Sequence, residues 1–504
     1  MSSPSTLTLL GHWVDGMRLE PQGDREIAVT DPATGSPIAS LRVATPAEVD
    51  RAVAAARAAA GPWGATSLAR RTSVLFAFRQ LLDANREQLA AAISREHGKV
   101  LADALGEVAR GIDVVEFACG IPQLLKGEAT SQASTGIDLR QLRQPLGVVA
   151  GITPFNFPAM VPLWMHPVAI AAGNAFVLKP SERVPSASLL VADLWAQAGL
   201  PAGVFNVVNG DRSTVEALLD HPGVDAVSFV GSTPVARAVH DRARLAGKRV
   251  QALGGAKNHM VVLPDADLDQ AADAAVSAGY GSSGQRCMAI SVVVAVGAIG
   301  DELVEKIVTR ARAVRVGPAS DPAAEMGPVI TAAARDRIAE LIGQGAQDGA
   351  ELVLDGRDPD VPGHPDGHWV GPTLFDRVRP EHAIYREEVF GPVLTVVRVA
   401  TLDDALALLD ANPYGNGSAI FTRDGGAARR FELEVRTGTV GVNVPIPIPV
   451  AAHSFGGWKD SAFTESGVYG PQGIAFYTRS KVVTTRWPRP ADGGVELGFP
   501  STAR

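Results

Sequence analysis

Alternating runs of apolar and polar residues divide the chain into a helical first part and a mixed remainder. The segment Thr45-Pro46-Ala-Glu48 supplies an N-cap, a first-turn proline and a capping-box acid. It opens an alanine-rich helix that we expect Gly61 and Pro62 to end. The same pattern predicts three further helices, over residues 67–82, 83–97 and 100–118.

From Gly147 onward the pattern changes to short apolar strands, most of them followed by a helical segment. The first such strands are GVVAGITP, AFVLKP, VFNVVNG, AVSFVGS, RVQALGG and MVVLP. The second half repeats the alternation with SVVVAVG, PVLTVVRV, GSAIFTR and TVGVNVP. Alternating βα units predict an α/β protein with doubly wound parallel sheets covered by helices.

Two segments depart from this alternation. Residues 128–146 are polar with β-prone stretches and predict an exposed hairpin, which is a candidate subunit contact. The tail after Trp487 is rich in Pro and Gly, and we expect it to be loosely ordered.

Composition limits the classes of function. A chain of 504 residues suggests two to three folding units. The net charge of −8 argues against nucleic-acid and anionic-membrane partners, which require basic patches. No window is apolar enough to span a membrane, and the N-terminus lacks the features of a signal peptide. Two cysteines in so long a chain fit a reducing, cytoplasmic setting, and spacings such as CxxC or HExxH are absent, so we expect no metal site.

A nucleotide site is indicated without the usual GxGxxG signature. After the strand AVSFV, Gly231 permits a tight turn, and Ser232 and Thr233 precede a helix that begins near Pro234. Such a helix start offers free N–H groups to a phosphate. Taken alone, an ordinary capped turn is the simpler interpretation.

A second strand ends in Val177-Leu-Lys179-Pro-Ser-Glu182, at the sheet edge where ligands bind. Lys179 is suited to hydrogen-bond a ribose. Glu182 disfavours a ribose 2′-phosphate, so the pair favours NAD over NADP. A pair of surface-loop charges is the alternative interpretation.

The segment GYGSSGQRCMAIS contains Cys287 next to Arg286. From these residues alone, Cys287 could be a nucleophile, a metal ligand, half of a disulfide or a core residue. Five motifs in order place it: PFNFP at 154–158, Lys-Pro at 179–180, FVGST at 229–233, GQRC at 284–287 and EEVFGP at 387–392. Together they resemble the aldehyde dehydrogenase superfamily over about residues 10–487.

The resemblance implies that Cys287 is the nucleophile. Its thiolate attacks an aldehyde to give a thiohemiacetal, hydride leaves to a nicotinamide, and a thioester remains. Asn156 resembles the oxyanion donor, and one such donor typically contributes about 10²–10³ in rate. Cys119 is expected to be a small core residue.

The same resemblance implies an NAD site. Glu388 resembles the residue that holds the nicotinamide ribose, and Phe390 packs beside it. The full set of expected cofactor residues is Thr153, Phe155, Lys179, Glu182, Arg183, Ser232, Glu388 and Phe390.

Hydrolytic members of the superfamily carry Glu-Leu-Gly-Gly-Lys where this chain has Ala252-Leu-Gly-Gly-Ala256. The glutamate activates water there, and such general-base help typically contributes about 10²–10⁴-fold. Because Ala252 cannot accept a proton, another acceptor is needed. A thiol ionises far more readily than water, and coenzyme A is the obvious biological thiol.

Further motifs resemble the CoA-acylating methylmalonate-semialdehyde dehydrogenases, which use NAD and yield propionyl-CoA or acetyl-CoA with loss of CO₂. They are GAKNH at 255–259, PDA at 264–266, VNVPIP at 442–447, HSFGGW at 453–458 and FYTR at 476–479. The chain departs from that pattern at Leu253-Gly254 and at residues 464–468.

Two arginines are expected to bind the carboxylate of such a substrate. In the narrower family these are the arginine before the cysteine, here Arg286, and one from a first-domain helix, here Arg110. A guanidinium matches a carboxylate bidentately. Alone, Arg110 could be a helix-surface partner of Glu107, and Arg286 could act by lowering the pKa of Cys287.

The resemblance also implies a domain plan and an assembly. We expect an NAD-binding domain at 1–127 and 147–254, a catalytic domain at 255–470, an oligomerisation arm at 128–146 and 471–490, and a loose tail at 491–504. The hairpin would pair with the strand near 477–486 of a neighbour in a homotetramer. Two other hypotheses stay open: a hydrolytic aldehyde dehydrogenase with a relocated base, and an idle fold kept as a structural protein.

Overall fold

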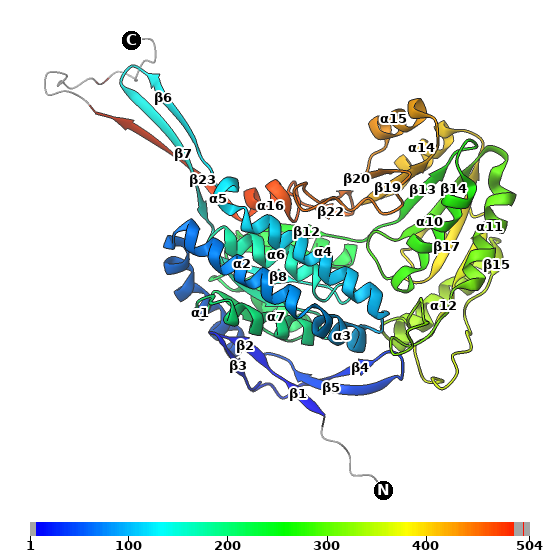
Figure 1. Cartoon of the computed structure of the whole chain (residues 1–504), viewed down its shortest axis with the longest axis horizontal. Helices are drawn as coiled ribbons and strands as arrows, with labels where there is room; N and C mark the ends of the chain where they lie inside the picture. Colours follow the sequence, from blue (N-terminus) through cyan, green and yellow to red (C-terminus); the bar gives the residue numbers. More distant parts are fainter. Residues whose placement is uncertain (1–6, 488–496, 498–504) are drawn as a thin grey trace, which may run out of the picture.

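Two large sheets with helices on both faces form the body of the protein (Figure 1). The computed structural model describes residues 7–487 and residue 497. The first sheet has a parallel centre of five strands, with antiparallel strands added at both edges. In order across the sheet the strands are β22 (Ala462–Phe463), β12 (Arg249–Leu253), β11 (Ala226–Val230), β8 (Val148–Ile152), β9 (Ala175–Lys179), β10 (Phe205–Val207), β2 (His12–Val14) and β3 (Met17–Leu19).

The helices around this sheet form two sets, and each set packs on the sheet through its own apolar cluster. One cluster joins the sheet to α2 (Leu68–Ala84), α3 (Arg86–His97), α4 (Leu101–Cys119), α5 (Ile121–Leu124), α6 (Met160–Ala171) and α7 (Ser186–Gln197). The other lies under α1 (Pro46–Ala65), α8 (Arg212–Asp220) and α9 (Thr233–Leu245).

The second sheet is parallel except for β15 at one edge. Its strands are β15 (Glu351–Leu354), β16 (Thr373–Asp376), β17 (Val393–Val399), β14 (Ile290–Val296), β13 (Asn258–Val262), β19 (Gly417–Phe421) and β20 (Thr439–Val442). One face packs on α10 (Leu268–Tyr280) and α11 (Gly300–Ala313), and the other on α12 (Ala332–Gln347), α13 (Ala383–Arg386), α14 (Leu402–Ala411) and α15 (Gly425–Glu434).

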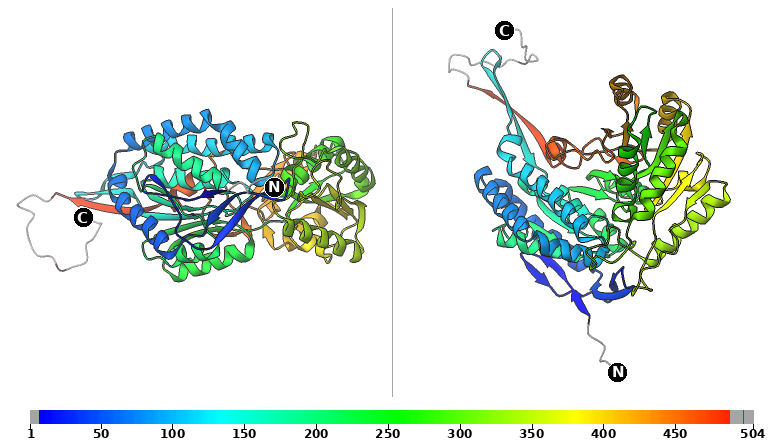
Figure 2. Two further views of the ribbon diagram at one scale, coloured as in Figure 1. Left: turned by 90° about the horizontal axis from the view of Figure 1, so that it is seen from below. Right: turned by 45° about the vertical axis from the view of Figure 1, so that its right-hand side comes forward.

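Three smaller sheets and two short 3₁₀ turns complete the described fold. They are β1 (Thr8–Leu10) with β5 (Ser36–Arg42) and β4 (Glu26–Asp31); β18 (Tyr414–Gly415) with β21 (Trp458–Lys459); β6 (Glu128–Ser134) with β7 (Ile137–Pro145) and β23 (Thr478–Arg486); and the turns η1 (Gly281–Gly284) and η2 (Gly297–Ile299). Helix α16 (Gly470–Phe476) leads into β23. The β6–β7–β23 sheet projects from the first-sheet body, away from the second sheet (Figures 1 and 2). The predicted fold class, with two doubly wound parallel sheets and a projecting hairpin arm, is confirmed.

Two sequence expectations are wrong. Helix α1 continues through Gly61 and Pro62, because Trp63 in its last turn is buried and its Nε1 donates to the Ile170 carbonyl at 2.8 Å. Strand β23 pairs with β7 of the same chain, from Thr478 opposite Pro145 onward, and not with a neighbour's hairpin. Helix α16 ends at Phe476, just before β23, and places the start of β23 beside the hairpin of the same chain.

The expected tail at 491–504 lies outside the described residues except for Leu497. Across residues 7–487, none of the helices has the length and apolar character that a membrane-spanning segment requires.

Candidate active site

Cys287 follows a left-handed turn in which Ser282, Ser283 and Gly284 have φ values of 52°, 55° and 68°. For non-glycine residues this conformation costs about 1–2 kcal/mol each. At Gly284 a Cβ would lie 2.1 Å from the Gly391 carbonyl oxygen, so a side chain is excluded. Ser283 Oγ donates to the Gly327 carbonyl at 2.6 Å, which fixes the turn that presents Cys287.

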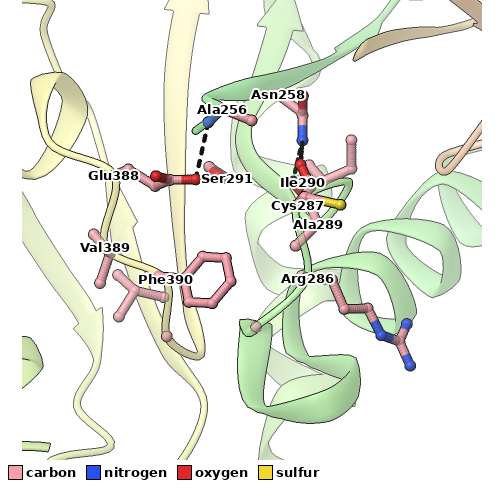
Figure 3. A pocket seen from close by; sticks show the side chains of 14 residues that line it. Ala256, Asn258, Arg286, Cys287, Ala289, Ile290, Ser291, Glu388, Val389 and Phe390 are labelled. Carbon is pink, nitrogen blue, oxygen red and sulfur yellow. Dashed lines mark hydrogen bonds between the residues drawn. The ribbon is translucent and has the colours of Figure 1, made fainter. Parts of the chain in front are cut away.

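Two asparagines from other strands fix the main chain of Cys287. The Nδ2 groups of Asn258 and Asn416 each donate to the Cys287 carbonyl at 2.9 Å. Asn258 opens β13, and Asn416 directly precedes β19 (Figure 3 shows the Asn258 contact). The backbone at Cys287 is therefore held by the second sheet.

Cys287, Glu388 and Phe390 line one cavity, with Arg286 at its margin (Figure 3). Glu388 Oε1 accepts a hydrogen bond from the Ala256 N–H at 2.9 Å. The Glu388 carboxylate packs so closely on the main chain that a Cβ at Gly255 would lie 2.3 Å from its Oε2. Burial raises the pKa of Glu388, while the Ala256 N–H and the Lys257 ammonium act in the opposite direction.

The thiol of Cys287 is protonated near neutral pH in this arrangement. Burial, followed by the neighbouring Glu388 carboxylate, raises the pKa of Cys287 to about 12. The N–H groups of Cys287 and Met288, and then the Arg286 guanidinium, lower it. Groups that favour the thiolate are therefore in place, and a change in hydration or charge is needed to form it.

Apart from Glu388 and Phe390, the expected dinucleotide residues lie at the carboxyl ends of adjacent strands of the first sheet or in the loops that follow them. Thr153 follows β8, Lys179 ends β9, and Ser232 follows β11. Lys179 Nζ lies 3.1 Å from the Glu182 carboxylate, and the Thr153 N–H donates to the Lys179 carbonyl at 3.2 Å. Arg183 is exposed, and its N–H donates to Ser181 Oγ.

This edge fits a dinucleotide in two respects. Ser232 occupies the N-cap position of α9 without a side-chain capping bond, so N–H groups of the first turn remain open to an anion. Thr153 Oγ1 is buried and has no hydrogen-bond partner among the described residues. Such a hydroxyl is suited to a bound polar group.

The segment that carries Asn156 connects this edge to the cysteine cavity. Asn156 is buried, and its side-chain amide has no hydrogen-bond partner among the described residues, so it is available to a substrate. Phe155 contacts Phe390 edge-on with ring centroids 5.9 Å apart, and it stacks on His97 at 6.0 Å. Phe155 and Phe390 thus meet at the junction of the two halves of the site.

The two arginines expected to bind a carboxylate are both engaged with acids. Arg286 Nη2 lies 2.5 Å from Asp103 Oδ1, and Figure 3 shows its guanidinium directed away from Glu388 and Phe390. Arg110 pairs with Asp113 at 2.9 Å and also donates to the Ile448 and Pro449 carbonyls. The structure does not bring the two guanidinium groups onto Cys287, and their role as carboxylate ligands stays a prediction.

Leu253, and not Ala252, lies on the Cys287 side of the first sheet. Neighbouring residues of a strand face opposite sides of the sheet. Leu253 belongs to the apolar cluster that includes Met288 and against which Cys287 packs, whereas Ala252 packs in the cluster under α9. The assignment of the missing base to position 252 stays a prediction, and the packing of the two side chains favours position 253 instead. Neither side chain can accept a proton, so β12 supplies no general base at either position.

Three further residues near the site were not expected from the sequence. Lys99 and Glu107 form a buried pair that contacts the Asn156 segment. Tyr469 packs on Trp164 and Phe455, and it lies close enough to Arg110 and Cys287 for their charges to affect its pKa. No local pattern marks these residues, because the Asn156 segment and Trp164, which they contact, are distant from them in sequence.

The chain belongs to the aldehyde dehydrogenase family, whose model matches residues 19–483. It is 52% identical to a malonate-semialdehyde dehydrogenase of Pseudomonas aeruginosa, over 98% of this chain and 99% of that one. It is 44% identical to the mitochondrial acylating methylmalonate-semialdehyde/malonate-semialdehyde dehydrogenase of Rattus norvegicus, over 96% and 90%.

A crystal structure of a protein from Sinorhizobium meliloti, in complex with NAD, matches the fold with a TM-score of 0.96 and 51% identity. The match covers 97% of this chain and all of that one. The family resemblance inferred from the motifs is confirmed.

Proposed function

We propose that this protein is an NAD-dependent, CoA-acylating dehydrogenase of malonate semialdehyde or methylmalonate semialdehyde. The proposal depends chiefly on one observation. Cys287 is half-buried, lines a cavity and packs against the apolar cluster that contains Leu253, so β12 presents no carboxylate on that side of the sheet. The names of relatives that share about half of the sequence support the substrate class.

In the proposed reaction the Cys287 thiol first loses its proton to solvent. Its Sγ then bonds to the aldehyde carbon as the C=O π bond breaks, and the Asn156 amide donates to the oxygen as it becomes negative. When bound, NAD accepts the hydride that leaves this carbon. The acyl group then remains on Cys287 as a thioester. The thiolate of CoA attacks the thioester carbonyl, forms acyl-CoA and releases the Cys287 thiolate, and loss of CO₂ gives acetyl-CoA or propionyl-CoA.

The roles of the cofactor residues are proposed from their positions. Lys179 and Glu182 suit the hydroxyls of a ribose at the end of β9, and the α9 start at Ser232 suits the diphosphate. Glu388 and Phe390 lie in the cysteine cavity, where the nicotinamide end has to reach. Thr153, Phe155 and Arg183 complete the proposed set, at the ends of the same strands and in the loops that follow them.

Arg110 and Arg286 are proposed to bind the substrate carboxylate. The Arg286 guanidinium keeps N–H groups that Asp103 does not use, because Asp103 occupies one terminal nitrogen. Arg110 uses one terminal nitrogen for Asp113, and its other terminal nitrogen would have to exchange the Ile448 and Pro449 carbonyls for the substrate carboxylate. Arg286 precedes the nucleophile, so a carboxylate one carbon from the aldehyde lies within reach of a rotated side chain.

We further propose the domain division at residues 127, 147, 254 and 470, a homotetramer built through the arm at 128–146 and 471–490, and a cytoplasmic location. The 254–255 division falls between β12 of the first sheet and β13 of the second. The arm presents β6 as an exposed edge strand. Both cysteines are free, which fits a reducing compartment.

The test is steady-state NADH formation from each semialdehyde with and without CoA, with the acyl product identified. CoA-dependent turnover with acyl-CoA as product supports the proposal. Equal turnover without CoA, with a free acid as product, would show the hydrolytic alternative, for which Glu388 is the carboxylate in the cavity. A missing NADH burst would show the idle fold.

A further inference from the structure

Lys99 is a buried cation that the proposed chemistry does not use. It lies between α3 and α4, and its side chain is 1% exposed. Its Nζ donates to the Asn156 carbonyl and to Glu107 Oε2, both at 2.7 Å. The Nζ also lies 4.4 Å from the centre of the Phe157 ring. Lys99 therefore contacts the residues on the main-chain segment of the expected oxyanion donor.

Glu107 extends this contact to the next helix. Its Oε1 accepts from the N–H groups of Ala159 at 2.8 Å and Met160 at 3.1 Å, where α6 begins. Its side chain is fully buried. The ion pair consequently holds both ends of the segment from Asn156 to Met160.

Stability alone does not account for this pair. Taking two charges out of water costs several kcal/mol per ion, and a well-packed apolar pair of the same volume is often as stable or more so. An apolar pair cannot, however, supply a donor to the Asn156 carbonyl or an acceptor for two N–H groups of α6. The specific gain is a fixed main chain at Asn156.

We propose that Lys99 and Glu107 are positioning residues that set the direction of the Asn156 side-chain amide for the acylation step. The inference rests on the proposed function, in which Asn156 donates to the developing oxyanion. A donor misplaced by about 1 Å loses much of its effect, because its hydrogen bond must meet the oxygen at its position in the transition state.

The test is a double-mutant cycle on the NADH burst with saturating NAD and malonate semialdehyde. Lys99→Met alone would leave Glu107 as a lone buried charge, so the working variant is Lys99→Met/Glu107→Gln. That variant removes both charges and retains an acceptor for α6. We expect its burst rate to fall about 10–10²-fold, which is less than the loss of about 10²–10³-fold that complete removal of one oxyanion donor typically causes. The dissociation constant for NAD is expected to stay within about twofold, because no contact of the cofactor edge is removed.

Coupling to Asn156 separates positioning from general support of the fold. In an Asn156→Ala background the same two substitutions are expected to lower the burst by less than about twofold, since the amide they position is absent. Lys257→Met is the matched control. Lys257 is equally buried, but it donates to the Ile384 and Glu387 carbonyls, so its effect is expected to add fully to that of Asn156→Ala.

A wild-type burst in Lys99→Met/Glu107→Gln, or an equal loss with and without Asn156, would overturn the inference. So would a variant that has lost NAD binding and its native circular dichroism, because the pair would then be needed for the fold. If the wild-type protein itself gives no burst with malonate semialdehyde, the proposed function fails instead.

Discussion

Leu253 and Ala252 are neighbours in β12, so their side chains lie on opposite faces of the first sheet. Only Leu253 belongs to the apolar cluster against which Cys287 packs. A carboxylate at 253 would enter the apolar cluster against which Cys287 packs, and we expect it to activate water toward the thioester from there. We expect Leu253→Glu to raise CoA-independent turnover, with about 10²–10⁴-fold as the upper range for a well-placed base. The measurement is NADH formation without CoA.

Ala252→Glu is the control for this change. Its carboxylate would enter the core under α9, so we expect lower stability and no gain of hydrolysis. A gain from Ala252→Glu with none from Leu253→Glu would contradict the placement of the missing base.

Arg110 and Arg286 can be separated from general catalytic residues by comparing substrates. Each charge-assisted contact contributes about 1.5–3 kcal/mol, which is about 10- to 150-fold in kcat/KM. We expect Arg110→Leu and Arg286→Leu to lose that factor on malonate semialdehyde and much less on propanal, which lacks the carboxylate. Equal losses on both aldehydes would exclude the carboxylate-binding role.

Among individual residues, the sequence was sufficient to predict the site residues that stand in recognisable local motifs. Cys287, Glu388 and Phe390 stand in recognisable segments, and the structure places them in one cavity. Lys99 could not be found in this way, because its partner Asn156 is 57 residues away and only the packing of α3, α4 and α6 brings them together.

Among the secondary-structure elements, α3 and α7 are joined by a contact that depends on pH. Glu96 of α3 accepts from the N–H of Ser186, at the start of α7, at 3.1 Å and from its hydroxyl at 2.5 Å. Burial raises the pKa of Glu96 to about 7, from an ordinary value of 4.5, and the two Ser186 bonds oppose this only in part.

A raised carboxyl pKa sets the sign of the pH effect. Between pH 4.5 and 7 the folded protein holds a proton at Glu96 that the unfolded chain releases, so this group's contribution to stability falls as pH rises. The shift corresponds to about 3 kcal/mol. Glu96→Gln is expected to remove this slope, as measured by denaturant unfolding at several pH values across the interval. An identical slope in the variant and the wild type would contradict it.

Helices and strands with a clear period were predicted well, and their ends less so. The alternation after Gly147 predicted the parallel strands because buried strands are almost wholly apolar. The end of α1 was missed because Trp63 packs against a distant helix, and this tertiary contact outweighs the local effect of Pro62.

In the whole molecule, the β6–β7–β23 sheet projects from the body, and packing within a single chain does not account for its position. Its strands are largely exposed, and β6 and β23 are edges. We expect removal of residues 478–504 to reduce the particle below a tetramer, as measured by light scattering, because β23 is lost from the arm. Removal of residues 488–504 alone is the control and is expected to leave the mass per particle at the tetramer value. A wild-type monomer, or a tetramer after both truncations, would contradict the proposed assembly.

The family resemblance predicted two parallel sheets and an arm, but it did not predict correctly which hairpin β23 pairs with. Gln141 of β7 lies opposite Val482 of β23, and its side chain donates to Ser480 Oγ across 339 residues of sequence. Pairing over so long a separation leaves no trace in local composition. The partner of β23 depends on where α16 ends in the folded protein, which is beside its own hairpin.

In the proposed reaction the acyl group stays on Cys287 until a thiol removes it. The most direct measurement forms the acyl-enzyme in a single turnover with NAD and malonate semialdehyde, and then follows loss of the thioester in buffer and in buffer with CoA. We expect the thioester to persist in buffer and to be removed at least about 10²-fold faster when CoA is present. Loss at the same rate with and without CoA would contradict it.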